Sequence, residues 1–128
     1  MKPEDMYVQY SSGHGSKSGL GVGVSYDQMR DAALAMPASE IVIFTMACYS
    51  GNLADSFNAK KSEWQNWAAS GRSLFVMTSS RDDQTSSTGP SNSAAGANGT
   101  AGSAFGYSLW TAMLGDADGY IDGVKDNY

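Results

Sequence analysis

One histidine and one cysteine occur in this 128-residue sequence, and both stand in short stretches that contain glycine. A thiol hydrolase needs a thiolate nucleophile, a histidine that moves protons, and backbone N–H groups that stabilise the oxyanion. We therefore expect His14 and Cys48 to form a catalytic dyad. The predicted oxyanion donors are the backbone N–H groups of Gly15 and Cys48, because glycine lets the chain approach closely. The alternatives are a surface histidine and an inert buried thiol, the usual state of a free cysteine.

Two apolar stretches precede these residues and predict the strands that position them. Residues 6–10 (MYVQY) are β-forming except for the glutamine. Residues 41–46 (IVIFTM) begin with four apolar side chains without alternation, which predicts a strand buried on both faces of a parallel sheet. Ligand crevices of open α/β sheets lie at the carboxyl ends of the strands. Both His14 and Cys48 are therefore expected at one edge of the sheet.

The rest of the chain predicts the helices and strand that complete this sheet. Asp27 is the expected cap of the first helix, and Pro37 ends it. The second helix begins beside Cys48, where the positive end of its dipole would favour a thiolate. The predicted elements are a hairpin or short strand pair over residues 16–25, helices over 26–36, 52–58 and 104–114, an amphipathic segment over 60–70 with Trp64, Trp67 and Ala68 inward, and a strand over 73–79. The expected fold class is α/β, a three-layer α/β/α domain with a mainly parallel sheet.

Composition limits the partners and the covalent chemistry. The formal net charge is −5, which argues against nucleic acid or an anionic membrane as a partner. A single cysteine forbids an intrachain disulfide and a cluster of cysteine metal ligands. Neither a signal peptide nor a transmembrane segment is expected, and the compartment stays open. The length predicts one domain over residues 1–128.

The second half contains two polar segments. Residues 80–103 are rich in Ser, Gly, Ala, Asn and Thr, which predicts a mobile loop beside the substrate site. Residues 115–128 form an acidic segment that resembles part of a calcium loop, with Asp116, Asp118 and Asp122 as the candidate ligands. No ligand side chain stands at the first or the twelfth position of such a loop, so a vestigial site or an acidic turn is expected. No cofactor is required, and calcium is a possible ligand.

Two sequence blocks together resemble the caspase-like cysteine peptidases, which include legumain, clostripain, gingipain, metacaspase and caspase. YSSGHGS and FTMACYSG are similar to the two catalytic blocks of that family. FVMTSSRDDQTSS resembles the following strand and substrate-pocket loop, closest to legumain, and GSAFGYSLWTAML resembles the helix after that loop. The resemblance covers about residues 3–119. It implies a caspase-haemoglobinase fold, endopeptidase activity with His14 and Cys48 as the dyad, and cleavage after a particular P1 residue.

The chain also departs from the family pattern. The family domain usually begins with another strand and helix, so a partial domain or a fragment is expected. Position 46 is often Asp, Glu or Gln in the family, whereas this chain has Met46, which leaves specificity open. Asp82 and Asp83 would favour a basic P1 residue unless they are only solvated charges, whereas Arg72 and Arg81 would favour Asn or Asp. The candidate substrate-binding residues are Met46, Ser79, Ser80, Asp82 and Asp83.

The function predicted from the sequence is that of a cysteine endopeptidase acting on a peptide or protein substrate. Two alternatives remain open. The first is a non-catalytic peptide-binding or regulatory relative of the same fold. The second is a calcium-responsive interaction module in which Cys48 is structural.

Overall fold

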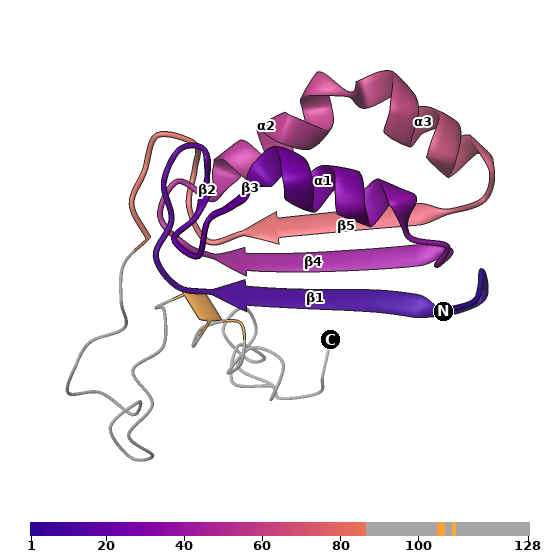
Figure 1. Ribbon diagram of the computed structural model, residues 1–128, viewed down its shortest axis with the longest axis horizontal. Coiled ribbons are helices and arrows are strands. Elements are labelled where there is room, and N and C mark those ends of the chain that lie inside the picture. Colours follow the sequence, from indigo (N-terminus) through magenta and orange to yellow (C-terminus); the bar gives the residue numbers. More distant parts are fainter. Residues whose placement is uncertain (87–104, 107–108, 110–128) are drawn as a thin grey trace, which may run out of the picture. The chain divides into compact units, whose positions relative to one another are not determined.

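A three-stranded parallel sheet forms the centre of the fold, with β4 between β1 and β5 (Figure 1). The computed structural model describes residues 1–86, 105, 106 and 109, and the sheet belongs to the unit Met1–Ser86. A separate two-stranded antiparallel hairpin joins β2 to β3. The elements are β1 (Met6–Ser12), β2 (Gly19–Leu20), β3 (Val24–Ser25), α1 (Tyr26–Ala35), β4 (Glu40–Met46), α2 (Gly51–Ala59), α3 (Lys61–Ala69) and β5 (Ser73–Thr78).

The three helices of this unit lie over the same face of the sheet (Figure 1). Each crossover, from β1 to β4 and from β4 to β5, moves in the same direction across the sheet. Right-handed crossovers that all move in one direction place their helices on one face. The mixed α/β class and the mainly parallel sheet are therefore confirmed. Among the described residues there is no third layer, so that part of the expected architecture stays a prediction.

The core lies between the helices and one face of β4. Ile41 and Ile43 are fully buried, and they contact a cluster formed by the inner faces of α1 and α2. Val42 and Phe44, which alternate with them, are only half-buried. The expectation that this strand is buried on both faces is therefore wrong for the described unit. An apolar run without alternation places apolar side chains on both faces of a strand, but it does not show which elements cover each face.

The predicted strands are confirmed, and the hairpin prediction over residues 16–25 is confirmed by β2 and β3. β1 runs two residues beyond the predicted stretch, to Ser12. The exposed face of the sheet includes Val8 and Tyr10 of β1 and Phe75 of β5. Phe44 and Phe75 pack edge to face on that side, with ring centroids 6.1 Å apart. This aromatic contact links the two strands on the face that none of the helices α1, α2 and α3 covers.

The predicted cap of α1 is wrong, because Ser25 and not Asp27 occupies the cap position. The Gln28 N–H donates to Ser25 Oγ at 3.1 Å, and the Ser25 N–H donates to Gln28 Oε1 at 2.9 Å. This reciprocal pair is a capping box. Asp27 instead accepts a hydrogen bond from the Ser56 hydroxyl at 2.6 Å, and this bond joins α1 to α2. Asp27 also forms an ion pair with buried Arg30 within α1.

The inward face of α3 also differs in part from the prediction. Trp64 and Trp67 are half-buried against the core, as predicted, but Ala68 is exposed. One residue past Trp67 turns about 100° farther around the helix, which directs Ala68 toward solvent. The α2 prediction is confirmed, and this helix begins at Gly51, three residues after Cys48.

Several predicted segments fall outside the described residues, wholly or in large part. They are the loop beyond residue 86, the acidic segment 115–128 with its candidate calcium ligands, and most of the helix expected over 104–114, of which the described residues 105, 106 and 109 are helical. Within the described part of the chain, no helix has both the length and the apolar character needed to cross a bilayer.

Candidate functional site

The parallel register of β1 and β4 brings the His14 loop and the Cys48 loop to one edge of the sheet. Ser12 pairs with Met46 at the end of the ladder. The next residue of the first loop continues this contact, since the Gly13 N–H donates to the Met46 carbonyl oxygen at 3.0 Å. Both loops leave the sheet at the carboxyl ends of the strands, where the β2–β3 hairpin also lies (Figure 1). This edge is where the sequence predicts the site.

Gly15 holds the two loops at a distance that a side chain would not permit. A Cβ atom on Gly15 would lie 2.4 Å from the Cys48 carbonyl oxygen and 2.8 Å from Ala47 Cβ. It would also lie 3.3 Å from the Cys48 backbone nitrogen. The glycine is therefore required by close approach of another backbone segment.

Two backbone N–H groups are unpaired at this meeting point. The hydrogen bonds on either side of Gly15 are made by its neighbours Ser16 and His14. The Ser16 N–H donates to Gly19 O at 2.9 Å, and the Gly21 N–H donates to His14 O at 2.7 Å. Across the described residues, neither the Gly15 N–H nor the Cys48 N–H has a hydrogen-bond acceptor. Two backbone donors without acceptors, one from the His14 loop and one from Cys48 itself, have the composition of an oxyanion site.

The thiol of Cys48 is half-buried and donates to the Ser86 carbonyl oxygen, with Sγ and O 3.8 Å apart. The His14 side chain is exposed at the same edge of the sheet. The thiol hydrogen bond therefore goes to Ser86 and not to the imidazole. The structure brings the two loops together, and the predicted proton transfer within a dyad stays a prediction.

The backbone turns sharply directly after the thiol. Tyr49 has a φ of 58°, the left-handed region that a bulky residue adopts only at a cost of about 1–2 kcal/mol. Three hydrogen bonds hold it there: the Tyr49 N–H donates to Gln84 O at 2.7 Å, and the Asn52 N–H and Nδ2 donate to Tyr49 O at 3.1 Å and 2.9 Å. This turn connects Cys48 to the start of α2.

Ser80 ties the same turn to the end of β5. Its hydroxyl donates to the Ala47 carbonyl oxygen at 2.9 Å and accepts from the Ser50 N–H at 3.1 Å. The Ser80 N–H in turn donates to Ser50 Oγ at 3.3 Å. Ser50 is fully buried, so these bonds satisfy polar groups that water does not reach. Ser80, predicted to bind substrate, acts in the structure to position the turn that carries Cys48.

Tyr26 approaches the Cys48 backbone from α1. The ring is buried, and its hydroxyl donates to the Cys48 carbonyl oxygen at 3.5 Å. Burial, and after it the charge of a Cys48 thiolate, raises the pKa of Tyr26 above its ordinary value of 10.0. The hydroxyl therefore stays protonated and available as a donor.

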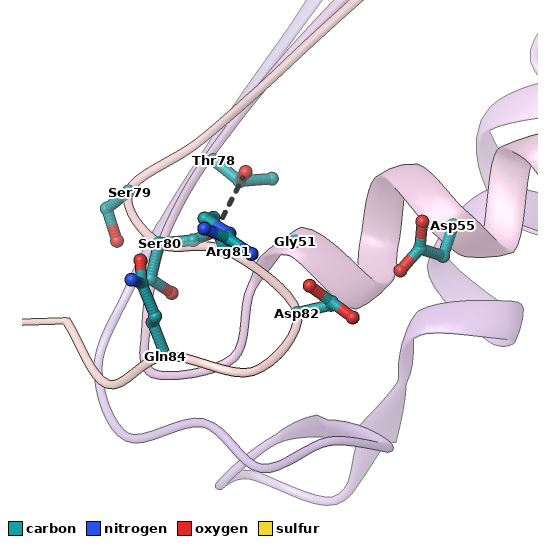
Figure 2. A pocket seen from close by; sticks show the side chains of 8 residues that line it. All are labelled: Gly51, Asp55, Thr78, Ser79, Ser80, Arg81, Asp82 and Gln84. Carbon is teal, nitrogen blue, oxygen red and sulfur yellow. Dashed lines mark hydrogen bonds between the residues drawn. The ribbon is translucent and has the colours of Figure 1, made fainter.

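A hollow of about 460 Å³ lies beside the turn, between the start of α2 and the loop after β5 (Figure 2). Asp55 projects from α2, and Asp82 lies on the loop. Asp83 does not line the hollow and pairs with Arg81 at 3.5 Å. The lining residues are Gly51, Asp55, Thr78, Ser79, Ser80, Arg81, Asp82 and Gln84.

Two predicted specificity residues lie elsewhere. The side chain of Met46 is 1% exposed and belongs to the core, so its expected substrate contact has no support here. Arg72 precedes β5, at the opposite end of the sheet from the strand carboxyl ends. Its guanidinium lies 3.8 Å from the centre of the Trp67 ring and donates to the carbonyl oxygens of Met36 and Ala38. The prediction that Arg72 brings a donor to the P1 pocket is therefore wrong.

The remaining site prediction concerns calcium. Asp116, Asp118 and Asp122 lie outside the described residues. Among the residues that the structure does describe, no group of three or more His, Cys, Asp or Glu side chains is arranged to hold a metal ion.

Several residues around the thiol were not predicted from the sequence. They are Tyr26, Tyr49, Gly51, Asp55 and Ser86. For Gly51 the signal is the residue type alone, because glycine is the usual residue where another backbone segment approaches closely. For Ser86 no local pattern exists, since it lies 38 residues from Cys48 in a loop.

A scan against protein-family models finds no match for this chain, and a search of curated proteins finds no match either. Function must therefore be inferred from the geometry of the site.

Proposed function

We propose that this protein is a cysteine endopeptidase with a caspase-haemoglobinase-like fold, in which Cys48 attacks the peptide carbonyl and His14 transfers the protons. The observation that carries the proposal is the pair of N–H groups of Gly15 and Cys48, which have no acceptor among the described residues and lie where the two loops meet. They come from the two blocks that resemble the caspase-like peptidases. In this mechanism they stabilise the oxyanion that forms when sulfur adds to the carbonyl carbon.

His14 has a role that its position supports. An imidazole at the same sheet edge can accept the thiol proton and then donate it to the leaving amine. His14 is exposed, and its loop is bounded by Gly13 and Gly15, so its side chain can adopt the orientation that substrate requires. Catalytic hydrogen bonds often form only in the complex with substrate.

The charge around the hollow favours a basic P1 residue. Asp55 and Asp82 both line it, and the opposing charge of Arg81 is partly balanced by Asp83. We therefore propose that Asp82 and Asp55 select the P1 residue. Asp83, which the sequence also suggested for this role, lies outside the hollow. Arg or Lys at P1 would be bound by these carboxylates.

The experiment is peptide hydrolysis by the full chain and two variants, with fluorogenic substrates that differ only at P1. Cys48→Ala should abolish turnover, and His14→Ala should lower kcat/KM by about two to four orders of magnitude. A thiol-reactive peptide probe should label Cys48 selectively and should require His14 for fast labelling.

Each alternative function predicts a different result. Unchanged turnover in either purified variant would reject the dyad. Peptide binding without hydrolysis in the wild-type protein would indicate the non-catalytic relative, and calcium-dependent binding that survives Cys48→Ala would indicate the interaction module. A preference for Asn or Asp at P1 would reject the acidic pocket, and Asp82→Asn should weaken basic substrates much more than neutral ones.

A further inference from the structure

The loop after β5 does more than border the hollow, because it is fastened to the turn that carries the nucleophile. We call residues 79–86 the strap. The strap backbone accepts two hydrogen bonds from that turn: the Tyr49 N–H donates to Gln84 O at 2.7 Å, and Asn52 Nδ2 donates to Asp82 O at 2.8 Å. Both bonds involve strap carbonyl oxygens, so they depend on its position and not on its side chains.

Gly51 allows the strap to lie directly against the start of α2. A Cβ atom on Gly51 would lie 2.4 Å from the Asp82 backbone nitrogen and 2.6 Å from the Arg81 carbonyl carbon. These are backbone atoms, which cannot rotate away as a flexible side chain would. Any side chain at position 51 would therefore push the strap outward.

The strap also closes on itself, and this brings its last residue to the thiol. The hydroxyl oxygens of Ser79 and Ser86 lie 2.8 Å apart, which joins the two ends of the strap. The Ser86 carbonyl oxygen then accepts from the Cys48 thiol at 3.8 Å. A carbonyl oxygen has no proton to donate, so this bond exists only with the protonated thiol. A thiolate would instead face the negative end of the carbonyl dipole.

We propose that the strap is an autoinhibitory element that holds Cys48 in a closed, protonated state, and that the site becomes reactive when the Ser86 end of the strap moves away from the sulfur. The inference rests on the proposed function only for the role of Cys48 as nucleophile. In the closed state the Ser86 carbonyl occupies one side of the sulfur and binds its proton. Displacement of the strap frees both the sulfur and the proton for His14.

The test measures the reactivity of the thiol itself, independently of any peptide substrate. The second-order rate constant for alkylation of Cys48 by iodoacetamide is measured on the full chain at one fixed pH. Ser79→Ala removes the contact to Ser86 that closes the strap and a bond to Ala47 O. Asn52→Ala removes the bond to Asp82 O that fastens the strap and a bond to Tyr49 O within the turn. Each should raise the rate constant at least about fivefold, the factor that one lost hydrogen bond gives in an opening equilibrium. Gly51→Ala should raise it about tenfold or more, because the added carbon displaces the strap.

The matched control is Asn66→Ala on α3, which alters an exposed asparagine that lies apart from the strap. Its rate constant should equal that of the wild-type protein. Circular dichroism identifies any variant that fails to fold, and Ser79→Ala and Asn52→Ala test the strap without steric strain if Gly51→Ala is unstable.

The outcomes separate the strap from the peptidase proposal. Equal alkylation rates in the wild-type protein and all folded strap variants would overturn the strap, even if peptide hydrolysis is observed. Faster alkylation in the strap variants would uphold the strap, even if no peptide is hydrolysed and the proposed function fails.

Discussion

Substitution of Gly15 by alanine tests whether the two loops meet as the structure describes. The added Cβ would lie 2.4 Å from the Cys48 carbonyl oxygen, whereas ordinary contact begins at 3.4 Å. The loops must therefore separate by about 1 Å, because neither contacting group is the end of a flexible side chain. A misplacement of about 1 Å in a catalytic site can cost about 100-fold in rate. Overpacking of this kind also costs about 1–3 kcal/mol of folding free energy.

The assay combines urea unfolding with peptide hydrolysis. We expect Gly15→Ala to lower the free energy of unfolding by that amount and to lower kcat/KM about 100-fold. The matched control is Gly19→Ala, whose Cβ would lie 2.2 Å from the Val24 carbonyl oxygen within the β2–β3 hairpin. It adds a similar steric conflict without touching the Cys48 loop, so it should reduce stability with much less effect on turnover.

Two results would refute the reasoning. If Gly15→Ala is as stable and as active as the wild-type protein, the two loops do not approach as described. If Gly19→Ala loses as much activity as Gly15→Ala at equal stability, the loss reflects general strain and not separation of Gly15 from Cys48.

Two further predictions concern stability. The hydroxyl of Ser56, followed by the charge of Arg30, lowers the pKa of Asp27 below its ordinary value of 3.8. The resulting stabilisation is present above pH 3.8 and is lost as the pH falls through the lowered pKa. Asp27→Asn should therefore weaken the decrease of the free energy of unfolding at acid pH, measured by urea unfolding at several pH values. An unchanged pH dependence would contradict this. Arg72→Ala removes a guanidinium that lies 3.8 Å from the Trp67 ring centre and should cost about 2 kcal/mol, with a change in tryptophan fluorescence. Arg72→Lys should recover only part of that loss, because lysine lacks the planar fork, and full recovery would count against the stacked geometry.

The sheet could be predicted from the sequence because its strands are apolar runs with clear ends. The same runs could not show that the described unit covers one face only, since that depends on elements elsewhere in the chain. The capping box of α1 was detectable from Ser25 and Gln28, which stand three residues apart before an apolar helix. Asp27 is also a good cap residue, so residue type alone does not distinguish it from Ser25. The reciprocal hydrogen bonds between Ser25 and Gln28 identify Ser25 as the cap.

The meeting of the His14 and Cys48 loops was also predictable, because parallel neighbouring strands end at the same edge. The contacts that fix Cys48 were not. Ser86 reaches the thiol across 38 residues of sequence, and Tyr49 adopts a left-handed turn that is rare for a tyrosine. Such contacts arise from the path of an irregular loop, which leaves no periodic pattern in the sequence.

The sheet order β1-β4-β5 has a consequence for the order of assembly during synthesis. Each strand pairs with the one made before it, so the sheet grows in one direction and no strand waits for a later one to be inserted beside it. The β1–α1–β4 segment contains His14, and Cys48 follows it two residues after β4 ends, so both leave the ribosome before β5 and the strap. Domains begin to form as the chain emerges from the amino end. Cys48 is therefore made before the strap that contacts its thiol, and the interval lasts as long as translation of α2, α3 and β5.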